Sequence, residues 1–114
     1  MVSSENEAAE SRLRPPSGAT AIVLSGFYEG LEVALDRERI VIGRGRKADL
    51  ALAEATISRS HAAVGFDRAG FFVEDLGSTN GTLVNGAPVV AKHHLKNDDE
   101  IQMGKLRLGV TLPR

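Results

Sequence analysis

From residue 21 onward, apolar residues recur at every second position, and this pattern constrains the fold more than any other feature of the chain. Residues 106–112 are the clearest case, since four apolar side chains there alternate with Arg107, Gly109 and Thr111. Successive side chains of a strand point to opposite faces, so this alternation predicts strands with one buried face. No window after residue 19 has apolar residues at helical spacing. Many short strands separated by turn residues predict an all-β sandwich or barrel.

Two Asn-Gly pairs lie close together in residues 75–86, whose sequence is DLGSTNGTLVNG. Asn-Gly is a strong signal for a tight turn, because both residues tolerate positive φ. The second pair, Asn85-Gly86, stands between two apolar runs and predicts a hairpin turn. The first pair, Asn80-Gly81, follows a predicted strand over residues 71–76 and predicts a short loop where a ligand would bind. The alternative is two consecutive hairpin turns without a ligand.

The first 19 residues differ in composition from the rest of the chain. They are rich in Ser, Glu, Ala and Arg and end in Pro-Pro-Ser-Gly. A helix of about ten residues is marginal alone, and the two prolines would end it. We therefore expect a disordered tail or linker over residues 1–19 and a single folded domain over residues 20–114.

Composition excludes several classes of function. The net charge of −1 gives no field that would attract nucleic acid or an anionic membrane. The chain has no cysteine, which excludes disulfides and thiolate chemistry. His93 and His94 are neighbours and would point to opposite faces of a strand, so we expect no metal site and no cofactor. No signal-peptide pattern or apolar span is present, and the expected location is the cytoplasm.

A glycine-rich basic segment, GRGRK over residues 43–47, follows a predicted strand. It is not a P-loop, because no Gly-Lys-Ser/Thr and no helical pattern follow it. It is not a dinucleotide fingerprint either, because a third glycine is missing. The simplest interpretation is a solvated basic turn.

A second polar segment, ISRSHA over residues 57–62, precedes another predicted strand. Ser58 and His61 suggest a hydrolase, but no nucleophile elbow and no acidic partner accompany them. We therefore expect no catalytic residue and no enzyme activity. His61 has a better explanation as a structural side chain, because a neutral imidazole donates from one nitrogen and accepts at the other and so can join two loops.

Taken together, these segments resemble the forkhead-associated (FHA) domain family. The resemblance rests on four motifs in the right order: Gly43-Arg44, Ser58-x-x-His61, residues 77–82 (GSTNGT) and residues 84–86 (VNG). It covers roughly residues 22–112. It implies an eleven-stranded β-sandwich whose loops at one end bind phosphothreonine peptides, and we expect the flexible N-terminal tail inferred from composition to precede it. FHA domains belong to the readers of phosphorylated motifs.

The resemblance also implies roles for individual residues. Arg44, Ser58 and Arg59 match the positions that hold the phosphate, for which a guanidinium fork is well suited. Thr79 matches the position that surrounds the threonine methyl group, and Asn80 the position that hydrogen-bonds the peptide backbone. Three further residues match positions that shape the loops: Gly43, His61 and Gly81.

The expected partner is thus a threonine-phosphorylated protein or peptide, bound by a monomer that acts as an adaptor in Ser/Thr kinase signalling. The family's contact to the third residue after the phosphothreonine stays open among four candidates: Arg46, Lys47, Thr56 and Leu83. Arg46 and Lys47 would favour an acidic side chain there. The alternative function is a phosphate-independent oligomerisation or scaffold module that uses the sheet surface, with Phe27, Tyr28 and Leu83 as exposed apolar residues.

Overall fold

Short apolar runs become short strands throughout residues 14–113, which are the residues that the computed structural model describes. Within this range the chain forms eleven strands: β1 (Thr20–Val23), β2 (Glu32–Ala34), β3 (Arg39–Gly43), β4 (Leu50–Ala51), β5 (Ala62–Asp67), β6 (Gly70–Asp75), β7 (Thr82–Val84), β8 (Ala87–Pro88), β9 (His93–His94), β10 (Glu100–Met103) and β11 (Leu106–Thr111).

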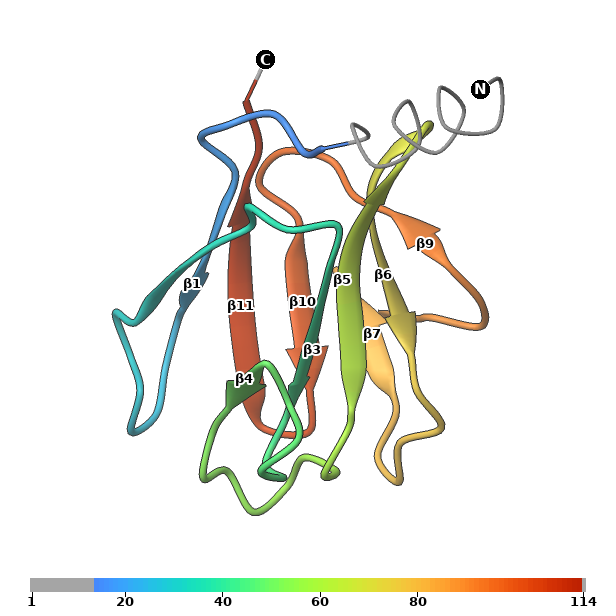
Figure 1. Ribbon diagram of the computed structural model, residues 1–114. Coiled ribbons are helices and arrows are strands. Elements are labelled where there is room, and N and C mark those ends of the chain that lie inside the picture. Colours follow the sequence, from blue (N-terminus) through green and yellow to red (C-terminus); the bar gives the residue numbers. More distant parts are fainter. Residues whose placement is uncertain (1–13, 114) are drawn as a thin grey trace, which may run out of the picture.

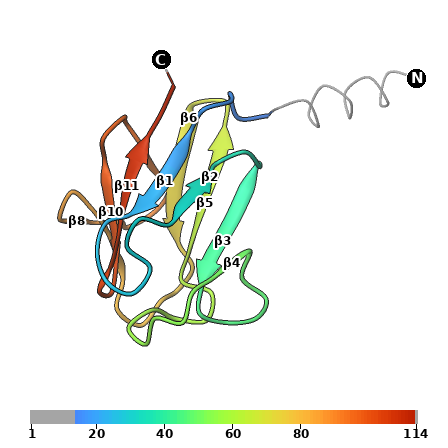
Figure 2. The same cartoon turned by 90° about the vertical axis from the view of Figure 1, so that its left-hand side faces the viewer.

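These strands form two sheets that pack face to face, as Figures 1 and 2 show from two sides. The six-stranded sheet has the order β2-β1-β11-β10-β7-β8, and the five-stranded sheet has the order β4-β3-β5-β6-β9. Neighbours pair antiparallel except β3 and β4, which are parallel. The predicted β-sandwich of eleven strands is confirmed.

The core lies between the two sheets and follows the period-two pattern. In β11, Leu106, Leu108 and Val110 are buried, whereas the intervening Arg107 and Thr111 are exposed. The core of the opposite sheet comes from its three central strands, with these buried side chains: Ile40, Ile42, Ala62, Val64, Phe71 and Val73. Burying each large aliphatic side chain contributes roughly 1.5–3 kcal/mol, so this alternation holds the two layers together.

The two Asn-Gly pairs have different structures. Asn85 and Gly86 have φ values of 51° and 85° and connect β7 to β8, as expected for a hairpin turn. In the first pair only Gly81 has a positive φ, of 79°. That turn leads from β6 in the five-stranded sheet to β7 in the six-stranded sheet. The alternative of two consecutive hairpin turns is therefore wrong.

The loops with the predicted binding residues gather at one end of the sandwich. Residues 44–49, 52–61 and 76–81 lie together at the lower end in Figure 1, while residues 14–19 and 112–113 lie at the other end. The tail predicted over residues 1–19 falls largely outside the described residues. Residues 14–113 contain no helix of the length and hydropathy that a membrane span requires.

Candidate functional site

Arg44 directly follows β3 and joins the loop of residues 44–49 to the segment before β5. Its Nε donates a hydrogen bond to the carbonyl of Ile57 at 2.8 Å, and its backbone N–H donates to the carbonyl of Ser58 at 3.1 Å. The backbone N–H of Gly45 donates to the carbonyl of Arg59 at 3.1 Å. Because only Nε of the Arg44 guanidinium is used in this way, its two Nη groups stay available to bind an anion.

Gly43 allows the two segments to approach this closely. A Cβ atom at Gly43 would overlap the carbonyl oxygen of Arg59 and would lie 2.9 Å from the carbonyl oxygen of Ser58. Any larger residue would push the segment of residues 58–59 away from β3. The requirement for glycine is thus steric, and it fixes the position of Arg59 relative to Arg44.

Ser58 and Thr79 connect two loops that come from different parts of the chain. The Ser58 hydroxyl oxygen accepts a hydrogen bond from the backbone N–H of Thr79 at 3.0 Å. A hydroxyl group both donates and accepts, so the Ser58 proton remains free to donate to a ligand. Next to this contact, the Asn80 amide Nδ2 donates to the carbonyl of Thr56 at 2.7 Å. The Asn80 Oδ1 has no partner among residues 14–113 and can accept from an N–H group.

His61 is fully buried and is hydrogen-bonded to both of these loops, the one that contains Ser58 and the one that contains Thr79 and Gly81. Its Nδ1 accepts a hydrogen bond from the backbone N–H of Ser58 at 3.0 Å. Its Nε2 lies 2.8 Å from the carbonyl of Gly81, to which it donates, because a ring that accepts at Nδ1 carries its proton on Nε2. His61 therefore contacts the backbone and not the hydroxyl of Ser58, and the two side chains form no catalytic pair.

Asp75 is a structural residue of this site that the sequence analysis missed. Its carboxylate accepts hydrogen bonds from the backbone N–H groups of Gly77 and Ser78, both at 3.0 Å, and from the hydroxyls of Ser78 and Thr82. Burial alone would raise the pKa of Asp75, but these hydrogen bonds outweigh burial and lower the pKa below its usual value. The available signal was an aspartate two residues before Gly-Ser-Thr, which is typical of a carboxylate that caps a turn.

Thr56 was also missed as a structural residue. Besides accepting from Asn80, it accepts at Oγ1 from the backbone N–H of Lys105 at 2.8 Å. The contact with Asn80 uses the Thr56 carbonyl group, which every residue has, so the sequence gives no signal for that contact.

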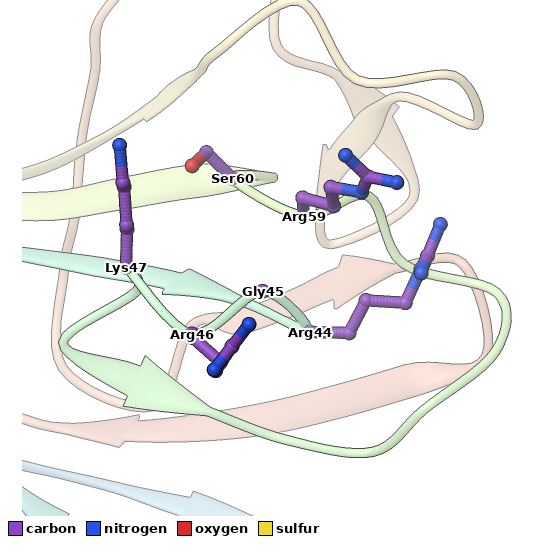
Figure 3. Close-up of a pocket in the computed structure, with 6 residues that line it drawn as sticks. All are labelled: Arg44, Gly45, Arg46, Lys47, Arg59 and Ser60. Carbon is purple, nitrogen blue, oxygen red and sulfur yellow. The ribbon is translucent and has the colours of Figure 1, made fainter.

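Basic side chains surround a pocket beside this network. The pocket, which we call the basic pocket, has a volume of about 620 Å³ and is lined by Arg44, Gly45, Arg46, Lys47, Arg59 and Ser60. Figure 3 shows Arg44 and Arg59 at one end of the pocket and Lys47 at the other, with Ser60 between them. Ser58, Thr79 and Asn80 do not line it; Ser58 directly precedes the lining residue Arg59, and Thr79 is hydrogen-bonded to Ser58. A cationic pocket with free N–H and O–H donors is suited to bind a phosphate group.

The fold and the site define a β-sandwich module with a cationic pocket at its loop end. The FHA domain family model matches residues 40–104, which is more than half of the chain. The chain belongs to the FHA domain family. Membership in this family of non-catalytic modules agrees with the expectation that the chain is not an enzyme.

Two curated relatives are similar over most of this chain. An oxoglutarate dehydrogenase inhibitor from Corynebacterium diphtheriae is 39% identical over 102 residues, which cover 89% of this chain and 71% of that protein. The glycogen accumulation regulator GarA from Mycobacterium tuberculosis is 40% identical over 94 residues, which cover 82% of this chain and 57% of GarA. This chain thus spans little more than half the length of GarA.

Solved structures share the fold. One, from a structural and functional analysis of phosphothreonine-dependent FHA domain interactions, superposes with a TM-score of 0.76 at 32% identity and covers 87% of this chain and 99% of its own. The whole described sandwich, rather than a part of it, is therefore the FHA fold.

Proposed function

We propose that this chain reads phosphothreonine in a partner protein or peptide, with Arg44, Ser58 and Arg59 holding the phosphate. The observation that carries the proposal is the basic pocket, in which Arg44 and Arg59 lie at one end beside the unused Ser58 proton. A phosphothreonine brings a charge of about −1.5 to −2 and three acceptor oxygens. Two guanidinium groups and a hydroxyl supply donors for those oxygens at a site that is already positively charged.

Thr79 and Asn80 read the part of the peptide next to the phosphate. Thr79 is fixed by its backbone hydrogen bond to Ser58, so its side chain has a set position relative to the bound phosphate. From there it contacts the threonine methyl group. Asn80 presents its Oδ1 to a peptide N–H group while its Nδ2 stays bonded to Thr56. Gly43, His61 and Gly81 keep the three loops in fixed positions relative to one another and do not touch the ligand.

The partner is a threonine-phosphorylated protein in Ser/Thr kinase signalling, and the chain acts as a monomeric adaptor in the cytoplasm. The names of two relatives, an inhibitor of oxoglutarate dehydrogenase and a regulator of glycogen accumulation, support a metabolic enzyme or its regulator as the protein at the other end of the interaction.

An NMR titration tests this function. Labelled protein is mixed with a phosphothreonine peptide library and, separately, with unphosphorylated and phosphoserine versions of the same peptides. Chemical-shift changes confined to residues around Arg44, Ser58 and Thr79, and strongest with phosphothreonine, are expected. Burial of one methyl group contributes about 0.8 kcal/mol, so phosphoserine should bind at least about fourfold more weakly. No change with any phosphopeptide would disprove the reader function.

A phosphate-independent scaffold module is the second candidate, and one exposed side chain favours it. Phe27 is 94% exposed and packs edge-on against Tyr28, at a centroid distance of 5.0 Å. Tyr28 and Leu83, the other apolar residues considered for this role, are half-buried. Sedimentation that depends on protein concentration, is unaffected by phosphopeptide and is abolished by Phe27→Ser would establish this function.

A further inference from the structure

We propose that the outer edge of β2 binds an extended segment of a partner protein, which adds a strand to the six-stranded sheet. The segment that fits this edge alternates apolar residues with lysine or arginine. Adding a strand to a sheet edge is a recurring mode of protein recognition. This contact needs no phosphate, so it is separate from the proposed phosphothreonine site and does not depend on it.

The backbone of β2 uses only one of its two sides. Just outside the ends of the strand, the Leu31 carbonyl and the Leu35 N–H form hydrogen bonds of 2.8 and 2.9 Å to residues that lie in β1 or flank it. In an antiparallel ladder, the backbone groups of successive residues point alternately toward the partner strand and away from it. The N–H and C=O groups of Glu32 and Ala34 therefore point away from β1. No other strand in the described part of the chain pairs with β2.

Exposed apolar side chains lie mainly on the hairpin of β1 and β2. Five large apolar side chains are exposed among the described residues, and four of them belong to this hairpin: Ile22, Leu24, Phe27 and Leu31. At the edge itself, Leu31 is 38% exposed and Val33 is half-buried, although Val33 lies opposite the buried Ala21 and faces the core. An added strand would cover these two side chains and remove apolar surface from water.

The three other sheet edges are less suited to take a strand. Natural proteins protect such edges with prolines, charged side chains and very short strands. β8 ends in Pro88, which has no N–H to donate. β4 and β9 have two residues each, and His94 of β9 is hydrogen-bonded to Asp67 at 2.9 Å. β2 has three residues, none of them proline or lysine, and Figure 2 looks onto the side of the sandwich where it lies.

The charge at this edge indicates the chemistry of the partner. Glu32 lies in β2 and Glu29 in the turn before it, and both side chains are exposed. Neither of them forms an ion pair with another residue of the range 14–113. Side chains of directly opposite residues lie on the same face of a sheet, and opposite charges there stabilise the pair. A lysine or arginine opposite Glu32 is therefore favoured, and an acidic residue is disfavoured.

The same carboxylate disfavours a second copy of this chain as the occupant. If two β2 strands paired antiparallel through their outer groups, Glu32 of each copy would lie opposite Ala34 of the other copy. The two Glu32 side chains would then be diagonal neighbours on one face, about 7–8 Å apart. Repulsion between them agrees with the proposed monomer and favours a cationic segment from another protein.

The test is an NMR titration of the labelled full chain with synthetic peptides of about six residues, a typical strand length. The first peptide alternates lysine and valine, and the second has glutamate in place of lysine. The third and fourth repeat the first with a methyl group on the backbone nitrogens of either the lysines or the valines. In antiparallel pairing, the residues opposite Glu32 and Ala34 donate their N–H groups to β2. These residues are the lysines when their side chains lie beside the Glu32 carboxylate.

The first peptide should shift the amide signals of residues 31–36. The glutamate peptide should bind there about two- to thirtyfold more weakly, because an attractive charge pair becomes a repulsive one. Methylation of the lysine nitrogens should weaken binding at least about fivefold through the lost hydrogen bonds, whereas methylation of the valine nitrogens should have little effect. Equal affinities of the two methylated peptides, or no shift of these signals with the first peptide, would overturn the proposal.

Variants of the chain assign the binding to this edge. Ala34→Pro removes an outward N–H, leaves the pairing with β1 intact and should abolish binding of the first peptide. Glu32→Lys should reverse the preference, so that the glutamate peptide binds more tightly. The control Glu38→Lys makes the same charge change next to β5, in the other sheet, and should leave the preference as it is.

Two results with these variants would contradict the proposal. One is an unchanged preference for the lysine peptide in Glu32→Lys. The other is a dimer of the free chain in sedimentation that Ala34→Pro disrupts, because a second copy would then occupy the edge. Binding of a phosphothreonine peptide should be the same in all three variants, and its absence would remove the proposed phosphothreonine function without affecting the edge contact.

Discussion

The hydroxyl oxygen of Ser58 accepts the backbone N–H of Thr79 at 3.0 Å, and this bond joins the loop before β5 to the loop before β7. The residue expected to donate to the phosphate therefore also fixes the residue expected to contact the threonine methyl group. Because one oxygen takes part in both interactions, the geometry of the phosphate contact and that of the methyl contact depend on each other.

Ser58→Ala should weaken binding of a singly phosphorylated phosphothreonine peptide by about 1.5–3 kcal/mol, the range for a hydrogen bond to a charged group. The free energy of unfolding should fall by about 1 kcal/mol or less, because Thr79 is exposed and water can replace the lost acceptor. Calorimetry and urea unfolding measure the two effects. Ser17→Ala, at an exposed position at the opposite end of the sandwich, is the control and should bind the same peptide with unchanged affinity. Equal affinities of the two variants would exclude a phosphate contact by Ser58.

Arg44→Ala should weaken the same binding by about 1.5–3 kcal/mol, or roughly 10- to 150-fold. The affinity of Arg44→Lys should lie between that of the unsubstituted protein and that of Arg44→Ala. Lysine retains the charge but loses the Nε hydrogen bond to Ile57 and the guanidinium fork. Arg68→Ala removes the same charge from the turn between β5 and β6 and should bind normally. Unchanged affinity of Arg44→Ala would remove Arg44 from the phosphate site.

The period-two alternation of residues 106–112 was enough to predict a strand of the sandwich, because which face of a strand is buried is a local property of the sequence. Asn85-Gly86 was likewise sufficient to predict a hairpin turn. Asn80-Gly81 carries the same turn signal, yet it leads into the other sheet. A dipeptide specifies the local backbone but not the sheet that the next strand joins.

The sequence predicts the proposed site residues by type and order, because contacts to a ligand would require particular side chains. The hydrogen bonds that hold these side chains in position could not be predicted from the sequence. Arg44 donates to the carbonyl of Ile57 and Asn80 to the carbonyl of Thr56, and carbonyl groups are the same in every residue. Such contacts depend on how closely two segments approach, which the whole fold determines.

His61→Ala should lower the free energy of unfolding by about 2–4 kcal/mol. The substitution leaves the Ser58 N–H and the Gly81 carbonyl without a partner and opens a cavity under the loops. Phosphopeptide affinity should fall with it, because the loops that hold Ser58 and Gly81 lose their common anchor. The control is His93→Ala, at an exposed position of β9, which should change stability by about 0.5 kcal/mol or less. Similar urea midpoints for the two variants would contradict the anchoring role.

Asp75→Asn should lower the free energy of unfolding at neutral pH, and this free energy should change less with pH in the acidic range than it does in the unsubstituted protein. The hydrogen bonds from Ser78 and Thr82 lower the pKa of Asp75 in the folded state despite its partial burial, so the folded state binds its proton less readily than the unfolded state does. The resulting stabilisation is fully present above the usual aspartate pKa of about 3.9 and is lost as pH falls below that value through the folded-state pKa. An asparagine does not titrate and can accept at one oxygen only, so the variant should lose about 1–3 kcal/mol at pH 7. Urea unfolding of both proteins from pH 7 to pH 2 should therefore give stability curves that converge on acidification. Parallel curves would mean that the Asp75 carboxylate does not support the loop of residues 76–81.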